Sequence, residues 1–347
     1  MTLASDAPDA RHDPGAAASR DRASVLAPAA EPVRARGGGE IRFGTASWTD
    51  PTITRGAVFY PPGVDSPEDR LRYYASRFSL VEVDSTYYAL PARRMAELWR
   101  ERTPAHFTFD VKAHALMTGQ PSEVRRLPPE LRDELPPSLA EKTRIYGHDL
   151  PPELYDEVWR IFLDALEPLR SSGKLGSVLL QYPKWFNPGL ASRERILEAR
   201  ERLGDVECAV ELRNALWFTA RNTEETLRFL GEHDLPFVMV DEPQGFRSSV
   251  PPLEAVTSAR LVVVRFHGRN AANWEKPGVS VAEKFRYLYD REELAEWVPR
   301  IEAAAERARS THVIMNNCYA NYGTTNAAEI AAMVRNAYGA DGPRIAG

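Results

Sequence analysis

Cysteine is scarce in this chain of 347 residues, which contains only Cys208 and Cys318. Two cysteines can form neither the disulfide framework of a small secreted protein nor a four-cysteine zinc site. Each lies in an apolar segment, so we expect two buried, reduced thiols and a cytoplasmic protein. A nucleophilic role for Cys318 is disfavoured, because no local Cys–His signature accompanies it.

Long hydrophobic runs and an excess of basic charge are also missing. No apolar run exceeds about five residues, whereas a membrane-spanning helix needs roughly 20. The net charge of −5 gives no overall basic field that would attract nucleic acid. Neither GxGxxG nor GxxxxGK[ST] stands between an expected strand and helix, so we expect no nucleotide cofactor. The hydrophobic share of 43% and the charged share of 27% are those of a globular protein without a membrane span.

The first 39 residues contain few aromatic or β-branched side chains and end in three glycines. Such a segment buries too little apolar surface to offset its ordering entropy. We therefore expect a disordered tail over residues 1–39, followed by one domain over 40–340. A signal peptide is not expected, because the best apolar stretch (25–27) is flanked by charges and followed by Pro28.

From residue 41 onward, short apolar runs alternate with longer amphipathic stretches, as in a parallel sheet with crossover helices. This pattern predicts an α/β fold, a single (β/α)8 TIM barrel, in which the crossover at 242–259 is degenerate, with a short possible helix at 253–258. Residues 114–152, rich in Pro, Arg and Glu, form a long insertion after the third strand. The expected strands are 41–47, 80–84, 107–113, 177–182, 206–212, 236–241, 260–267 and 312–317. The expected helices are 66–78, 91–102, 153–171, 190–203, 222–233, 290–308 and 323–338.

Polar side chains gather near the C-terminal ends of the expected strands. In strand 80–84, a period of two places Glu82 and Asp84 on one face and the valines on the other. The other strands also end on polar residues, and the active sites of such barrels are built at this rim. We therefore predict one site there. The catalytic candidates are Glu82, Glu211, Asp241 and His267. The predicted substrate-binding residues are Thr45, Trp48, Asp84, Tyr88, Lys112, Gln181, Arg213, Arg265, Asn316 and Asn317.

The same charges can also be interpreted as an ion-pair network that closes the barrel. Desolvation of buried ions costs several kcal/mol per ion and often cancels the Coulomb gain, which makes a purely structural purpose the weaker explanation for so many. Asp110 lies deeper in its strand than Lys112, so it is equally well explained as a structural partner.

Several motifs also stand in a recognisable order: Gly-Thr-Ala-Ser-Trp-Thr (44–49), Phe-Tyr-Pro (59–61), Val-Glu-Val-Asp-Ser-Thr-Tyr-Tyr-Ala-Leu-Pro (81–91), Phe-Thr-Phe-Asp-Val-Lys (107–112), Leu-Leu-Gln-Tyr-Pro (179–183), Val-Glu-Leu-Arg (210–213), Arg-Phe-His-Gly (265–268) and Asn-Asn (316–317). Together they resemble the domain-of-unknown-function 72 family, also called YecE-like. The resemblance spans about 41–338 and implies one TIM barrel without a settled activity. Asp84 departs from the family pattern, where Asn is more frequent, and adds a carboxylate.

The leading functional expectation is an enzyme, a hydrolase or an isomerase or lyase. It would perform acid–base or hydrolytic chemistry on a small anionic, hydroxylated substrate such as a sugar phosphate. Lys112, Arg213 and Arg265 would attract the anionic group, and the arginines suit bidentate binding. Glu82 and Glu211 are suited to acid–base work, because closely packed carboxylates raise one another's pKa.

Two alternatives stay open. One is a divalent-metal-dependent phosphodiesterase or isomerase of the endonuclease IV or xylose isomerase type, with one ion held by the four catalytic candidates. Only seven histidines are present, too few near the rim for a His-rich zinc cluster. The other is a non-catalytic barrel that binds a nucleotide or nucleic acid through the basic residues of the insertion. The oligomeric state is left open.

Overall fold

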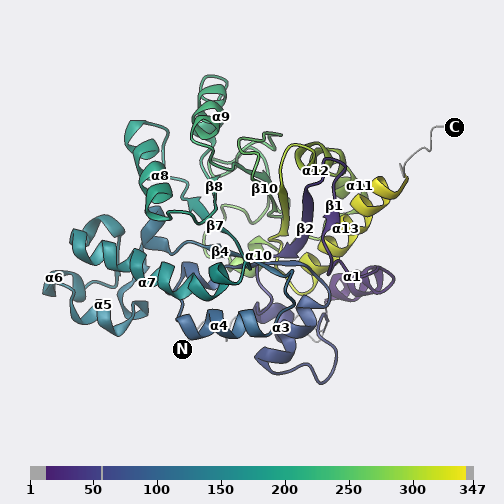
Figure 1. Ribbon diagram of the computed structural model, residues 1–347, viewed down its shortest axis with the longest axis horizontal. Helices are drawn as coiled ribbons and strands as arrows, with labels where there is room; N and C mark the ends of the chain where they lie inside the picture. Colours follow the sequence, from purple (N-terminus) through teal and green to yellow (C-terminus); the bar gives the residue numbers. More distant parts are fainter. Residues whose placement is uncertain (1–12, 56–57, 341–347) are drawn as a thin grey trace.

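A computed structural model describes residues 13–55 and 58–340 of the chain. In these residues eight parallel strands form a barrel, with helices around it (Figure 1). The strands follow one another around the barrel in chain order. They are β2 (Glu40–Thr45), β3 (Leu80–Val83), β4 (Thr108–Lys112), β7 (Leu175–Tyr182), β8 (Cys208–Leu212), β9 (Val238–Asp241), β10 (Leu261–Phe266) and β11 (Ser310–Met315). The predicted (β/α)8 barrel is confirmed.

The barrel closes through two seams of different strength. β2 and β11 pair over six residues, from Glu40 opposite Ser310 to Thr45 opposite Met315. β8 and the chain before β9 meet at one parallel bridge, at which the Val210 amide donates to the Pro236 carbonyl at 2.8 Å. The β8–β9 seam is therefore the weaker junction of the barrel wall.

Most of the predicted crossover helices form, and two of them begin at a residue whose side chain caps the helix. Ser66 accepts from the Asp69 amide at the start of α3, and Asp290 and Glu293 form a reciprocal capping box at the start of α11. The helix predicted at 290–308 is divided in two at Trp297. The helices are α3 (Pro67–Ala75), α4 (Arg93–Glu101), α7 (Pro152–Ser171), α8 (Leu190–Arg202), α9 (Thr223–Glu232), α11 (Arg291–Ala295), α12 (Val298–Ala305) and α13 (Tyr322–Ala340).

The crossover between β9 and β10 has no helix in residues 242–259. The degenerate crossover is therefore present, but the short helix expected at 253–258 does not form. The insertion between β4 and α7 carries two short antiparallel strands, β5 (Ser122–Glu123) and β6 (Arg144–Ile145), and two short helices, α5 (Pro129–Asp133) and α6 (Pro137–Ala140). It extends from one side of the barrel (Figure 1).

The predicted disordered tail needs correction. Residues 1–12 lie outside the described residues, but residues 13–39 contain α1 (Pro14–Ser24) and β1 (Val33–Arg34). α1 packs beside α13, with Arg22 bound to Glu329 at 2.7 Å. β1 pairs with β2 in antiparallel orientation. The segment is ordered by polar partners about 300 residues away along the chain, which its composition does not reveal.

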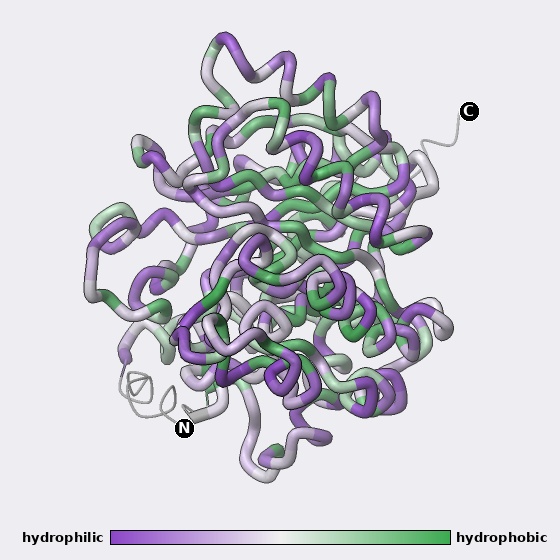
Figure 2. Tube along the Cα trace, turned by 90° about the vertical axis from the view of Figure 1, so that its left-hand side faces the viewer, coloured by the Kyte–Doolittle hydropathy of each residue, from purple (hydrophilic) through white to green (hydrophobic). Residues whose placement is uncertain are grey.

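Strand register divides the side chains between the barrel interior and the helix layer. Arg265 is opposite Val240 on β9 and Ile314 on β11, while Phe266 is opposite Asp241 and Met315. Residues in register with Arg265 face the barrel axis, and those in register with Phe266 face the helices. Hydrophobic residues dominate the central strands (Figure 2). None of the described helices is long and apolar enough to cross a membrane.

Candidate functional site

Arg265 occupies the centre of the barrel mouth, between two glutamates from other strands. Its Nε and Nη2 donate to the two carboxylate oxygens of Glu82 at 2.9 and 2.7 Å, and its Nη1 donates to Glu211. All three side chains are at most 1% exposed. Burial alone would raise the pKa of Glu211, but Arg265 and His267 outweigh burial and hold it well below its usual value. The pKa of Glu82 is raised, because burial prevails there.

Glu211 also fixes the state of His267. Its Oε1 accepts from Gln181 at 2.7 Å and lies 3.1 Å from His267 Nε2, while His267 Nδ1 lies 2.8 Å from Asn316 Nδ2. An amide nitrogen can only donate, so Nδ1 accepts and Nε2 carries the proton. Burial lowers the pKa of His267 to about 3, which keeps the ring neutral. Glu82, Glu211, Arg265 and His267 therefore form a buried floor.

Above this floor, Lys112 and Asp84 are partly exposed and unpaired. Lys112 Nζ has no hydrogen bond or ion pair with any described residue, and it lies over the ring of Tyr87, 4.6 Å from the ring centroid. The Asp84 carboxylate likewise has no side-chain partner in the described part of the chain. Burial, together with Glu82, raises the pKa of Asp84 to about 7, and burial with Arg265 lowers that of Lys112 to about 8. These two groups titrate close to neutral pH.

Arg213 and Glu242 line the other side of the mouth. Arg213 lies 3.4 Å from Glu211 and 3.3 Å from Glu242, and its guanidinium stacks over Trp274 at 5.0 Å. Glu242 accepts from the Val250 amide at 2.7 Å, but its Oε2 is buried without a hydrogen bond in the described residues. Burial raises the pKa of Glu242 to about 7. Glu242 is not among the residues predicted from the sequence.

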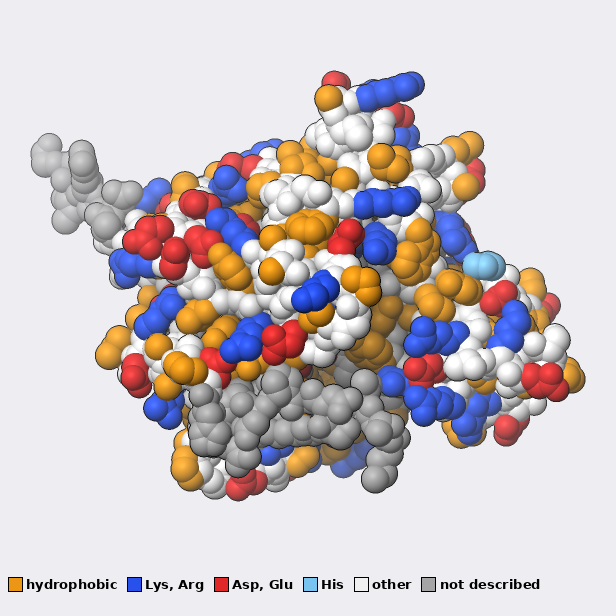
Figure 3. Space-filling view, turned by 180° about the vertical axis from the view of Figure 1, so that it is seen from behind, with side chains coloured by type: hydrophobic (Ala, Val, Ile, Leu, Met, Phe, Trp, Pro, Cys, Tyr) orange, Lys and Arg blue, Asp and Glu red, His pale blue; other side chains and the backbone are white. Residues whose placement is uncertain are grey.

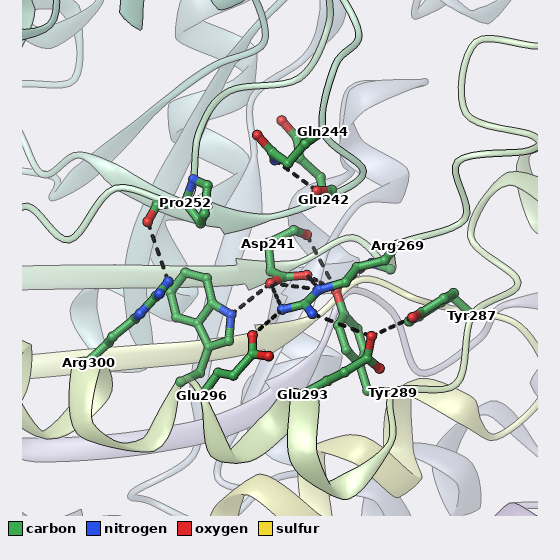
Figure 4. Close-up of polar contacts among 12 residues, drawn as sticks. Asp241, Glu242, Gln244, Pro252, Arg269, Tyr287, Tyr289, Glu293, Glu296 and Arg300 are labelled. Atoms are coloured by element: carbon green, nitrogen blue, oxygen red, sulfur yellow. Dashed lines mark hydrogen bonds and ion pairs between the residues drawn. The ribbon is translucent and has the colours of Figure 1, made fainter.

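Asp241 does not join the mouth. Its carboxylate accepts from Tyr289 at 2.7 Å, from Trp297 Nε1 at 2.7 Å and from Arg269 Nη2 at 2.7 Å, all in the layer outside the barrel (Figure 4). Arg269 in turn binds Glu296 of the helix layer at 2.9 Å. Asp241 thus ties β9 to the segment around α11 and α12, which gives no support to its predicted catalytic role.

Three predicted substrate-binding residues also face away from the mouth. Thr45 donates to the Ser47 carbonyl at 2.8 Å, and Trp48 packs edge-on against Trp99 of α4 with ring centroids 5.8 Å apart. Asn317 donates to the Tyr287 carbonyl at 2.9 Å and to Asn326 of α13 at 2.9 Å. The remaining members converge on the mouth or its edge: Asp84, Tyr88, Lys112, Gln181, Arg213, Arg265 and Asn316.

Register explains both the missed residue and those that face away. Asn316 follows the inward parity of Ile314, whereas Asn317 follows that of Met315. In the same way Glu242 continues the inward series of Val240, and Asp241 is opposite Phe266. A run such as Val-Met-Val-Asp-Glu places two acids in succession, so only the pairing with β10 distinguishes the inward one.

The described residues show no group of three or more His, Cys, Asp or Glu side chains arranged to hold a metal ion. The four residues proposed as metal ligands illustrate why. Arg265 lies between Glu82 and Glu211 and already neutralises them, and Asp241 is on the outer side of β9. The donor set therefore does not fit the single-ion site considered above.

Comparison with known proteins agrees with the barrel and its motifs. Residues 42–345 match the family described as "Protein of unknown function DUF72". The chain belongs to the DUF72 family. A DUF72 protein from Thermotoga maritima, solved by crystallography, superposes with a TM-score of 0.66 at 29% identity over 85% of this chain and 98% of that one. One from Enterococcus faecalis superposes with a TM-score of 0.65 at 26% identity over 85% and 97%.

Two curated relatives carry only provisional names. The UPF0759 protein YunF of Bacillus subtilis is 32% identical over 80% of this chain and 88% of its own length. The UPF0759 protein YecE of Escherichia coli K12 is 27% identical over 63% of this chain and 65% of its own length. These names describe no reaction, so the DUF72 family assignment supports the fold and leaves the chemistry to the site itself.

Proposed function

We propose that this barrel is an enzyme that performs acid–base chemistry on a small anionic, hydroxylated substrate at the C-terminal mouth. The observation that carries the proposal is that Asp84 and Lys112 have no hydrogen-bond or ion-pair partner among the described side chains, whereas the side chains of the buried floor below them are all paired. Buried or half-buried charges normally have partners. Asp84, directly after β3, and Lys112, at the end of β4, lack them in the described residues and are therefore suited to receive a ligand.

The rim has groups for each part of such a substrate. Lys112 attracts an anionic group, and Arg213, held by weaker contacts beyond 3.2 Å, is placed to share it. Gln181 and Asn316 offer amide groups for hydroxyls. Phosphate and hydroxyl recognition together favour a sugar-phosphate-like molecule.

Proton transfer falls to Asp84 and Lys112. A carboxyl group with a pKa of about 7 and an ammonium with a pKa of about 8 are suited to act as base and acid between pH 7 and 8. The buried Glu82, Glu211 and His267 would instead set the electrostatics of the floor, because their polar atoms are occupied by one another and by Arg265. The sequence pattern suggested the opposite assignment, in which the buried glutamates and His267 are catalytic and Asp84 and Lys112 bind the substrate.

Nucleic-acid binding is less well supported. In the insertion, Arg125 and Arg126 bind Glu123 at 2.8 and 3.1 Å, and Lys142 lies 3.7 Å from Asp149. Over the face shown in Figure 3, where the insertion lies at the right, Lys and Arg side chains stand beside Asp and Glu. A groove that holds phosphate backbones needs a continuous basic surface.

A turnover assay with a panel of sugar phosphates in D2O tests the proposal. NMR would follow loss of substrate and exchange of its C–H protons. Asp84→Asn and Lys112→Met are each expected to lower kcat/KM by about 10²–10⁴-fold. Lys174→Met is the matched control, because Lys174 is a buried lysine bound to the carbonyls of Arg100 and Thr103, far from the mouth. Equal loss in the control, or no turnover and no stabilisation by any of the compounds, would contradict the proposal.

A further inference from the structure

The opposite, N-terminal end of the barrel has a cavity of its own. It has a volume of about 310 Å³, within the range of small-ligand sites. The N-terminal face of a barrel is usually a stability surface, so a polar cavity there needs an explanation. Its lining includes Arg42 of β2, Gly176 of β7, Arg309, and Ser310 and His312 of β11.

Ser310, His312 and Asp110 form a hydrogen-bonded chain in this cavity wall. Ser310 Oγ lies 3.0 Å from His312 Nε2, and His312 Nδ1 lies 2.8 Å from Asp110 Oδ2. Asp110 is 1% exposed, His312 is 3% exposed, and Ser310 is partly exposed. The acid is therefore deepest and the hydroxyl is closest to the cavity, the order that nucleophilic catalysis requires.

The hydrogen bonds also fix the tautomer of His312. The Asp110 carboxylate can only accept, so Nδ1 of the neutral ring carries the proton and Nε2 is left to accept from Ser310. Asp110 is held on its other oxygen by Ser177 at 2.9 Å. A Cβ on Gly176 would lie 2.5 Å from Asp110 Oδ1 and 2.8 Å from His312 Cε1, so the pair needs glycine at that position.

Three arginines and two glutamates line the cavity, which leaves one positive charge in excess for an anionic group. Arg42 binds Glu40 through Nη2 at 2.8 Å, but its Nε is buried without a hydrogen bond in the described residues. Arg42 is opposite His312 in the β2–β11 register. Arg309 adjoins Ser310, and its guanidinium has no partner in the described part of the chain. Either can stabilise a developing oxyanion or bind a charged substituent.

We propose that Ser310, His312 and Asp110 are the nucleophile, base and orienting acid of a second catalytic site, which hydrolyses small carboxylic esters that carry an anionic group. Ser310 Oγ attacks the ester carbonyl carbon while its proton passes to His312 Nε2. The C–O bond to the alcohol then breaks, and the alcohol leaves with that proton. Water cleaves the resulting acyl-serine by the same route, which releases the acid and restores the hydroxyl.

An alkyl fluorophosphonate tests the site on the full chain. The wild type is expected to gain one adduct per chain, found at Ser310 by peptide mass spectrometry. It should also release a burst of p-nitrophenolate from mono-p-nitrophenyl succinate, whose free carboxylate supplies the anionic group, faster than from the neutral p-nitrophenyl acetate. Ser310→Ala and His312→Gln are expected to lower the rate of fluorophosphonate labelling and the rate of p-nitrophenolate release by at least about 100-fold each. Ser122→Ala is the matched control: Ser122 lies 3.4 Å from His114, whose Nδ1 has no described partner, so that pair lacks the orienting acid.

Ser310→Cys keeps the result interpretable if other variants fold poorly. Its thiol is expected to react with iodoacetamide before the buried Cys208, in protein whose circular dichroism matches the wild type. Absence of any adduct on folded wild-type protein, or labelling that survives Ser310→Ala, would overturn the proposal. So would a cysteine at position 310 that reacts no faster than Cys208.

Discussion

Arg265 is the side chain on which the barrel mouth most depends. It is 1% exposed and joins Glu82 and Glu211, which come from β3 and β8. We predict that Arg265→Met lowers the free energy of unfolding by about 3–5 kcal/mol, because two buried carboxylates lose their counter-charge. Urea denaturation at pH 7 measures the loss. Arg228→Met, at an exposed residue 3.8 Å from Glu224, should change stability by less than about 0.5 kcal/mol. A similarly small change for Arg265→Met would mean that the mouth is more hydrated than its burial indicates.

Asp84 is expected to make the fold less stable as the pH rises from about 4 to 7. Burial raises its pKa to about 7 from an ordinary value of 3.8, so the folded state binds the proton more tightly than the unfolded state. The contribution of Asp84 to the free energy of unfolding is therefore greatest below about pH 4, and it declines as the pH rises to 7. Asp84→Asn removes the decline and should add about 1–3 kcal/mol at pH 8 relative to pH 5. Urea titrations at both pH values give the comparison; a gain that is the same at both would refute the shift.

For single residues, the sequence predicts which residue types lie at the rim better than it predicts whether each side chain points into the barrel or toward the helices. Glu82, Lys112, Glu211 and Arg265 were found because each lies within a strand whose period of two is clear. The sequence predicts Asp241 instead of Glu242 at the mouth, because both follow the same apolar run and only the register with β10 separates them. Unpaired neighbours such as Asp84 and Lys112 become visible only once β3 and β4 are aligned.

Among the elements, α1 is held to the barrel by polar contacts along its length, and Asp13 supplies those at its start. Asp13 caps the helix by accepting from the amides of Gly15 and Ala16 at 2.8 and 3.1 Å, and it also accepts from Tyr322 of α13 at 3.0 Å. We predict that Asp13→Ala lowers the free energy of local unfolding of α1 by about 1–2 kcal/mol. Trypsin should then cleave after Arg20 about 5–30 times faster.

The control for α1 is Ser24→Ala, because Ser24 is exposed and its hydroxyl donates to the Asp21 carbonyl of the same helix at 2.8 Å. It should leave the cleavage rate unchanged, and neither variant should alter the urea midpoint of the barrel by much. If cleavage accelerates equally in both variants, the Asp13 cap is not what holds α1.

The elements also show where prediction from sequence ends. The eight strands were predictable because each is an apolar run bounded by helix or turn signals. α1 was not, because its Ala-, Arg- and Ser-rich sequence has no apolar stripe, and its partners lie far away along the chain: Glu329 in α13 and Asn321 directly before it. Likewise, the sequence predicts that the crossover at 242–259 is degenerate, because only a short helix-like stretch lies there. It does not predict that β8 and β9 meet at a single bridge.

For the molecule as a whole, the net charge of −5 says little about either end of the barrel. Inside the barrel, acids and bases of β3, β4, β8 and β10 gather at the mouth, while Asp110 and His312 form a separate cluster toward the base. The alternation of strands and helices predicts the barrel, and it predicts a polar rim. It does not predict the second cluster, because Ser310 and His312 read as ordinary residues at the start of a strand.

Substitutions at the mouth and at the N-terminal end of the barrel are expected to affect stability independently of each other. β11 runs from Ser310 at the base to Met315 at the mouth, a rise of about 16 Å at 3.3 Å per residue. Effects of substitutions more than about 10 Å apart usually add. We therefore predict that Asp84→Asn and Ser310→Ala change the unfolding free energy additively, within about 0.5 kcal/mol, in a double-mutant cycle at pH 8. A larger coupling energy would show that the charged interior transmits the change along the barrel axis, and the mouth and base would then have to be treated as one network.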